Sequence, residues 1–302
     1  MFNLKVFNIQ NLNIFFISIL PIGLIAGSLI SNTIIILICI FFLYDLSIRN
    51  DLIYLNKFNF YFLIVINIYL FLNSFFISEN SESLIKSIGF LRFIILTYAI
   101  SYYIIDNSNK ILKVWTLLFL IVTFDILFEY TFGKNILGFK SPYIGRISSF
   151  TGDELKIGGY YFGFILLCSI FLKRYKQKYF LFFSVLFFIA SFLIGERSNF
   201  IKIFLMYFLF FTFFTQLNFF KKFFVIVLFI SIPLTLILSS QNYYKDRYIH
   251  DVISEELIEK FQTKKEDKIY KRIISENRYF SHYYVATNIF KNNILFGSGF
   301  KS

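Results

Sequence analysis

Long apolar runs separated by short polar segments occupy most of this 302-residue chain. A helix needs about 20 residues to cross a hydrocarbon core of about 30 Å. The runs are continuous in Phe, Ile and Leu, whereas strands of an outer-membrane barrel would alternate apolar and polar residues over about ten positions. Helices also satisfy their own backbone hydrogen bonds where water is absent. The pattern therefore predicts an all-α, polytopic integral membrane protein with about nine complete transmembrane helices, at residues 12–30, 32–46, 58–78, 84–105, 112–130, 157–172, 179–195, 199–217 and 221–240.

Composition supports this prediction. The chain is 57% hydrophobic, 23% aromatic and only 16% charged, and its mean hydropathy is +0.67, whereas soluble domains carry about 25% charged residues. Pro21 and Gly23 interrupt the first run and a second run follows at once, so we interpret the first as a retained helix and not as a secretory signal. Cys39 and Cys168 lie inside apolar runs without partner spacing, which favours small buried side chains over a disulfide or a metal site.

Basic residues in the short loops predict the orientation. Lys and Arg concentrate in the cytoplasmic loops of membrane proteins. With the N-terminus in the cytoplasm, every short inside segment is basic, and the net charge of +12 is largely explained without nucleic acid. These inside residues are Lys5, Arg49, Lys57, Lys110, Lys113, Lys173, Arg174, Lys176, Lys178, Lys221 and Lys222.

This topology divides the chain into N-terminal transmembrane helices at 1–130 and a region at 131–302 that carries two long extracytoplasmic loops, at 131–156 and 241–280. Loops of such length are usually functional or disordered. Charges of both signs are mixed with apolar residues in the second loop, which suits an amphipathic helix on the membrane surface or a solvated helical cap without chemistry. The start of a re-entering helix follows.

Three arginines fall on the predicted outer side beside helix ends. Arg146 lies in a polar, glycine-rich stretch before a helix, Arg197 lies in a turn too short to leave the membrane surface, and Arg278 lies where the long loop re-enters. Exposed amides at a helix N-terminus favour an anion, and a charge at membrane depth is costly unless it is paired or used. For each arginine, the alternative is an interfacial side chain or an ion pair, such as Glu196 with Arg197.

The order of these motifs resembles the bacterial O-antigen polymerase and O-antigen ligase superfamily. The resemblance covers roughly residues 140–302 and rests on GRISSFTGDEL from Gly145, GERS from Gly195, and IFKNNILFGSGF after the long loop. The last segment is similar to the family's re-entry helix and Pro-Leu-x-Gly-x-Gly turn, although Asn293-Ile294 stands where a Pro is common.

The resemblance implies glycan transfer at the outer face of a bacterial inner membrane. The donor would be a polyprenyl-diphosphate-linked glycan, the acceptor another glycan or a lipid, and no cofactor, metal or nucleotide sugar would be needed. It also implies that Arg146, Arg197 and Arg278 bind the diphosphate, since guanidinium groups hold phosphate bidentately. We therefore expect the guanidinium groups of Arg197 and Arg146 or Arg278 to face one outer cavity within about 12 Å of each other.

The base for this reaction is not evident. Members of the family usually carry a His shortly after the Gly-x-Gly turn, and neither His250 nor His282 has that position. We expect that this sequence is truncated and that the natural chain continues beyond Ser302; otherwise Asp153, Glu154 or Glu196 would act as the base. His282 shares a helix face with Arg278, and we interpret it as interfacial in preference to catalytic.

Three ionisable residues in the N-terminal half need a separate explanation. Arg92 lies in span four, and Asp125 and Glu129 lie one turn apart in span five. Charges within a membrane span are costly, so an Arg92 bridge to either carboxylate is the favoured explanation, ahead of substrate contact and of interfacial exposure.

Two other classes of function stay open. A multi-span transporter would use broken helices near the membrane centre, and Pro21 with Gly23, or Pro233, could break spans. No convincing internal repeat supports it, and the distinctive charges lie at the outer surface. A structural or regulatory subunit without an active site is the third interpretation.

Overall fold

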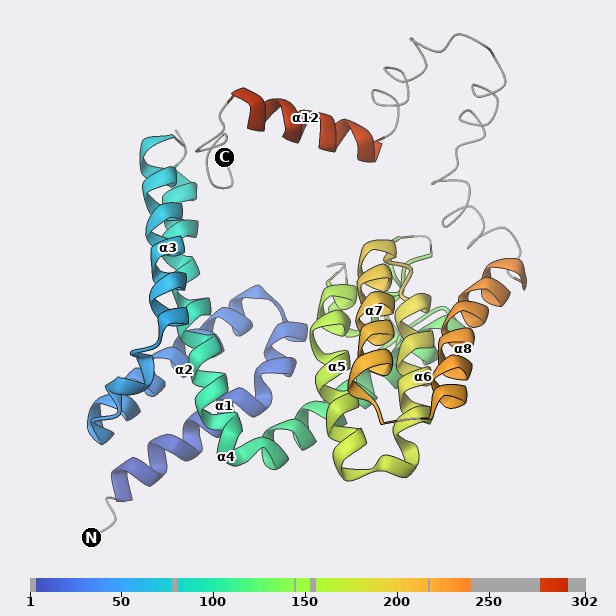
Figure 1. Cartoon of the computed structure of the whole chain (residues 1–302), viewed down its shortest axis with the longest axis horizontal. Helices are drawn as coiled ribbons and strands as arrows, with labels where there is room; N and C mark the ends of the chain where they lie inside the picture. The colour runs from blue at the N-terminus through green and yellow to red at the C-terminus, as the bar shows by residue number, and fades with distance from the viewer. Residues whose placement is uncertain are drawn as a thin grey trace. The chain divides into compact units, whose positions relative to one another are not determined.

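The structure, a computed structural model, describes residues 4–77, 81–143, 145–152, 156–216, 218–239 and 278–292, and its regular elements there are all helical (Figure 1). Seven of these helices are long and apolar enough to cross a membrane. The all-α prediction is therefore confirmed for this part of the chain, and the helices are those of a membrane-embedded protein. The helices are α1 (Leu4–Ala26), α2 (Ser28–Arg49), α3 (Phe58–Phe76), α4 (Ser81–Phe132), α5 (Ile157–Tyr175), α6 (Gln177–Leu193), α7 (Arg197–Leu209), α8 (Phe219–Ser239) and α12 (Arg278–Asn292), with short turns η1 (Leu52–Leu55), η2 (Ser149–Thr151) and the π-helical η3 (Phe210–Phe214).

The count of nine spans stays a prediction, because two of the predicted spans share one helix. Residues 84–105 and 112–130 both belong to α4, which has 52 residues and leaves helical geometry only at Asn107. The polar residues predicted to form a loop there are helical, and the Asn107 side chain donates to the Tyr103 carbonyl over 3.2 Å. In addition, the apolar part of α6 is shorter than that of the other spans.

The first break lies earlier than predicted. The expected boundary at residues 31–32 is wrong, since α1 ends at Ala26 and α2 begins at Ser28. Gly27 between them has a φ of +122°, which strongly favours glycine over residues with a side chain. Pro21, expected to interrupt the run, lies inside α1.

The chain forms two units, Met1–Phe42 with Ile100–Tyr248, and Leu43–Ala99 with Ile249–Ser302. In the first unit, α5 packs against α6 and α7, and α8 covers α6 (Figure 1). Aromatic rings fill the centre of this bundle. Phe188 stacks on Phe229 with ring centroids 4.5 Å apart, and Phe119 lies 4.8 Å from Phe187.

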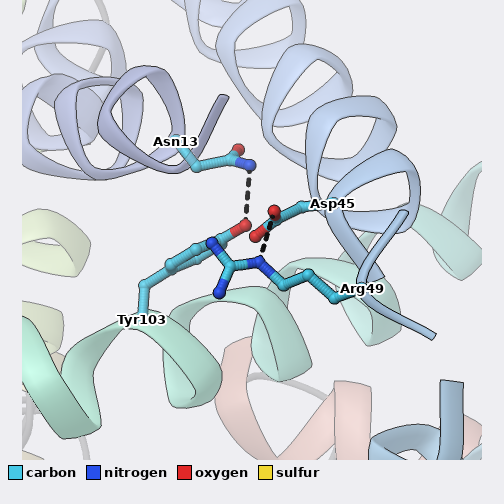
Figure 2. A network of polar contacts seen from close by, with 4 residues as sticks. All are labelled: Asn13, Asp45, Arg49 and Tyr103. Carbon is cyan, nitrogen blue, oxygen red and sulfur yellow. Dashed lines mark hydrogen bonds and ion pairs between the residues drawn. The ribbon is translucent and has the colours of Figure 1, made fainter. Parts of the chain in front are cut away.

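Hydroxyl and amide groups join the helices inside the first unit. Tyr161 and Thr123 share a hydrogen bond of 2.9 Å between α5 and α4, and Tyr207 and Ser169 share one of 2.7 Å between α7 and α5. Asn13 of α1 donates to the Tyr103 hydroxyl over 2.9 Å (Figure 2). An unsatisfied polar group in hydrocarbon costs several kcal/mol, so such bonds specify which helix faces meet.

The second unit has its own buried charge. Arg49 Nε donates to Asp45 Oδ1 over 2.8 Å, one helical turn back along α2 (Figure 2). Asp45 is fully buried, and a buried carboxylate is retained where a charged partner binds it. Arg49, predicted as a cytoplasmic topology signal, therefore also pairs with a buried acid.

Two lysines bind backbone carbonyl groups of η3, the turn that follows α7. Lys173 donates to the Phe214 carbonyl over 2.6 Å, and Lys222 donates to the Thr212 carbonyl over 2.7 Å. The last carbonyls of a helix have no partner within the helix, and cations are favourable beside them. These lysines, which the sequence marks as cytoplasmic, thus also cap a helix.

Candidate functional site

The structure brings the backbone of Arg146 against the turn that precedes Arg197. Ile147 N donates to Ile194 O over 3.3 Å. A Cβ placed on Gly195 would lie 2.5 Å from Gly145 O and 3.7 Å from the Arg146 Cα. Gly195 ends α6 with a φ of +76°, and Glu196 then adopts the extended conformation from which α7 begins at Arg197. The two segments predicted to act together therefore meet at a glycine that leaves no room for a side chain.

Two buried carboxylates hold the Arg146 segment from the other side. Asp125 accepts from Ile136 N over 2.8 Å and from Ser149 Oγ over 2.5 Å. Glu129, one turn later on α4, accepts from Ser149 N over 2.6 Å and from Ser148 N over 3.2 Å. Residues four apart share a helix face, so the end of α4 presents both acids to one loop.

These contacts explain why Asp125 and Glu129 are buried, since hydrogen bonds from backbone and hydroxyl donors offset the cost of burying carboxylates. The two acids bind the loop between α4 and α5, and this role was not among the explanations that the sequence favoured. Arg92 belongs to the other unit, so its bridge to either acid stays a prediction.

Ser149 is the most constrained residue of this loop. It is fully buried and has a φ of +48°, which is uncommon for a residue other than glycine. Its amide and hydroxyl bind the two carboxylates, and its carbonyl accepts from Asn135 Nδ2 over 2.8 Å. Asn135 also accepts from Phe139 N over 2.8 Å. The loop is therefore folded onto α4 by polar side chains and not by apolar packing alone.

A cavity of about 410 Å³ lies where the N-terminal turns of α5 and α7 meet. Its polar groups come from Lys156, Tyr160, Glu196 and Asn199, and its remaining lining comes from Gly159, Gly163, Phe164 and Leu24.

The polar lining is partly cross-linked. Asn199 Nδ2 donates to Glu196 Oε2 over 2.6 Å, and Asn199 Oδ1 accepts a long bond of 3.5 Å from Lys202. Gly158 allows this arrangement, because a Cβ at that position would overlap the Glu196 carboxylate. Glycine at 158 thus lets the start of α5 approach the turn at Glu196.

The predicted site residues are therefore found in different places. Arg146 and Arg197 are half-buried and belong to adjoining segments, and Glu196 lines the cavity. Asp153 and Glu154 lie outside the described residues. That the guanidinium groups face one cavity stays a prediction.

The remaining two candidates belong to the second unit. Arg278 is the first residue of α12, as the sequence predicts, and His282 is exposed one turn later. The long loop before them, at 241–277, and the glycine turn after them, at 297–299, lie outside the described residues. Their part in a site with Arg146 and Arg197 stays a prediction.

Sequence reasoning missed Lys156, Tyr160 and Asn199. The available signal was the glycine spacing in IGGYYFG, since Gly159 and Gly163 lie four residues apart and share a helix face. Small residues on one face of a membrane helix mark a close approach or an open space. Asn199 lies within one turn of Glu196, at the start of the same helix.

Within the described residues, no three His, Cys, Asp or Glu side chains lie close enough to hold a metal ion. The chain matches no family model, no curated protein and no solved structure.

Proposed function

We propose that this protein transfers a glycan from a polyprenyl-diphosphate-linked donor to a glycan or lipid acceptor, as an O-antigen polymerase or ligase does, at the outer face of a bacterial inner membrane. The N-terminus would be cytoplasmic, and Arg146, Arg197 and Arg278 would bind the diphosphate. The resemblance in sequence supplies the reaction class, and the site geometry supports the pairing of two of these arginines.

The observation that carries the proposal is the contact between the Gly145-Arg146 backbone and the Gly195-Glu196-Arg197 turn. Positions 146 and 197 are far apart in sequence, yet the Ile147–Ile194 hydrogen bond and the close approach of Gly145 to Gly195 hold their backbones side by side. A diphosphate needs several cationic donors held in one place, because its charge increases as it departs. A pair of arginines on adjoining rigid segments suits that demand.

In the proposed reaction, these groups act on the donor sugar and on the acceptor hydroxyl. The acceptor hydroxyl oxygen attacks the anomeric carbon of the donor sugar, and the bond from that carbon to the diphosphate oxygen breaks. The diphosphate leaves with the bonding electrons, and the arginines stabilise its charge. The hydroxyl proton passes to a base. Of the candidates Asp153, Glu154, Glu196 and His282, Glu196 lies in the described cavity beside the arginine segments.

The test is complementation of cells in which this chain's gene is deleted. Lipid-linked and acceptor-linked glycans are measured by gel profile and mass spectrometry. Arg146→Ala and Arg197→Ala should each lower transfer by about 10- to 100-fold, the effect of losing a charge-assisted bond in a transition state. Arg146→Lys and Arg197→Lys should lower transfer less than the alanine variants do, because lysine keeps the charge although it cannot bind phosphate bidentately.

Arg174→Ala is the matched control, since Arg174 is an exposed arginine near the other end of α5. Its glycan profile should equal that of the unsubstituted protein. If both alanine variants complement fully at normal membrane levels, the proposal is wrong. An unchanged glycan profile together with solute uptake into sealed vesicles would favour transport instead.

A further inference from the structure

The cavity between α5 and α7 has the balanced lining of a site for a neutral, polar ligand. Among the described lining residues, Lys156 and Glu196 contribute one charge of each sign, and Asn199 adds an amide. A simple anion or cation would meet an unfavourable charge as well as a favourable one. Its volume of about 410 Å³ falls within the range of ligand pockets, which is about 300–1,000 Å³.

Two polar atoms in this lining have unused hydrogen-bonding capacity. The hydroxyl of Tyr160 is buried without a hydrogen-bond partner in the described part of the chain, and the residue is only 8% exposed. Glu196 binds Asn199 through Oε2, which leaves Oε1 without a protein partner among the described residues. Buried polar groups normally have partners, so the Tyr160 hydroxyl is left for a ligand, and the half-buried Glu196 carboxylate offers it a further acceptor.

Glycines leave space for that ligand along α5. Gly159 and Gly163 both line the cavity, and a Cβ on either would meet no atom within 4 Å. The aromatic rings of Tyr160 and Phe164 stand one residue along from them, with centroids 4.9 Å apart. Aromatic side chains beside groups that bind hydroxyls suit a ligand ring that has an apolar face and polar edges.

We propose that this cavity binds a sugar ring, and that in the reaction it holds the terminal sugar of the acceptor. The sugar hydroxyls would bind the Glu196 carboxylate, the Tyr160 hydroxyl and the Asn199 amide, while the ring stacks over the glycine face of α5. The assignment to the acceptor rests on the proposed function, whereas the binding of a sugar does not.

The chain carries its own probe for occupancy. Trp115 is the single tryptophan, and its ring packs edge-on against Phe164 with centroids 5.2 Å apart. A ligand that contacts Phe164 should therefore change tryptophan emission. The purified protein in lipid nanodiscs is titrated with the methyl glycosides of glucose, galactose, mannose and N-acetylglucosamine. Ethylene glycol serves as a hydroxyl-bearing control without a ring.

At least one glycoside should give a saturable change in emission, with a dissociation constant of about 1 mM or tighter. Gly163→Leu should abolish this change by filling the cavity, and Glu196→Gln should weaken binding by about tenfold through loss of a charged acceptor. Gly89→Leu is the matched control, because Gly89 is also helical and open to space but does not line the cavity. Size-exclusion profiles establish that each variant is folded.

Absence of a saturable response to all four glycosides would overturn the proposal, as would equal binding by folded Gly163→Leu or by Glu196→Gln. The titration contains no diphosphate donor, so its outcome is independent of transfer. Binding without any effect of the arginine variants on glycans would retain the sugar site and reject the proposed reaction. The reverse result would retain the reaction and reject the site.

Discussion

At the residue scale, the acids at the end of α4 decide how the loop between α4 and α5 is held. Asp125 is fully buried and binds one backbone amide and one hydroxyl, and Glu129 binds two further amides of the same loop. Because donors surround these carboxylates, each acid stabilises the loop only if it keeps acceptors on both of its oxygens. Their role is therefore to position Arg146, which follows Ile136 and precedes Ser148 in the held segment.

Asp125→Asn tests this role. The amide retains one acceptor but turns two donors toward the Ile136 amide or the Ser149 hydroxyl, so at least one buried donor loses its partner. We expect the free energy of unfolding to fall by about 1.5–3 kcal/mol, the size of a hydrogen bond to a charged group. Unfolding in mixed detergent micelles measures it.

Asp106→Asn is the control for Asp125→Asn, because Asp106 is an exposed acid on the same helix. Its unfolding free energy should stay within about 0.5 kcal/mol of the unsubstituted protein, as for most surface changes. Equal stability of the two variants would contradict the assigned role of Asp125.

At the element scale, Gly195 connects α6, the Arg146 segment and α7. Its positive φ ends α6, and its missing side chain admits the Gly145 carbonyl. The sequence shows a glycine between two helices and so predicts the turn. It does not show which distant segment the turn contacts, since that depends on packing between residues some 50 positions apart. The pairing of Arg146 with the Arg197 turn could thus be predicted only through resemblance.

Gly195→Ala should disrupt that contact. Alanine at positive φ costs about 1–2 kcal/mol, and its Cβ would in addition collide with Gly145 O. We expect both stability and glycan transfer to fall, as measured by micelle unfolding and by complementation.

Gly133→Ala separates strain from collision. Gly133 has a φ of +69°, similar to the +76° of Gly195, but a Cβ there meets nothing within 4 Å. It should show the backbone strain alone and keep its transfer activity. If Gly195→Ala lowers stability and glycan transfer no more than Gly133→Ala does, the contact with Gly145 does not hold the site together.

The long helix α4 shows a second limit of sequence reasoning. Polar residues at 106–109 predict a loop, yet hydrophilic side chains are compatible with an exposed helical turn, and only Asn107 departs from helical geometry. Hydropathy indicates where the chain leaves the apolar phase, but it does not indicate whether the helix ends there. Conversely, α3 starts at Phe58 as predicted, after the extended Lys57.

At the scale of the whole molecule, the apolar runs predicted the helices well because length and hydropathy are local properties. The cavity could not be predicted in the same way. Its lining combines α1, α5 and α7, and its character depends on two glycines and one tyrosine that look like ordinary parts of an apolar helix. The orientation of the helices, on which the predicted outer location of this cavity depends, is a prediction from the loop charges alone and can be measured directly.

Single introduced cysteines test that orientation. The native Cys39 and Cys168 are buried and should react slowly, so labelling reports the introduced residue. Lys140→Cys is exposed in the loop between α4 and α5, and Lys178→Cys is exposed at the start of α6. If basic loops face the cytoplasm, an impermeant maleimide added to spheroplasts should label position 140, and should label position 178 only after the membrane is permeabilised. The unsubstituted protein gives the background, and detergent-solubilised protein gives full labelling for both variants.

The opposite pattern would place the cavity and both arginine segments on the cytoplasmic side. A donor presented outside could not reach them there, and the proposed reaction would fail whatever the chemistry of the site.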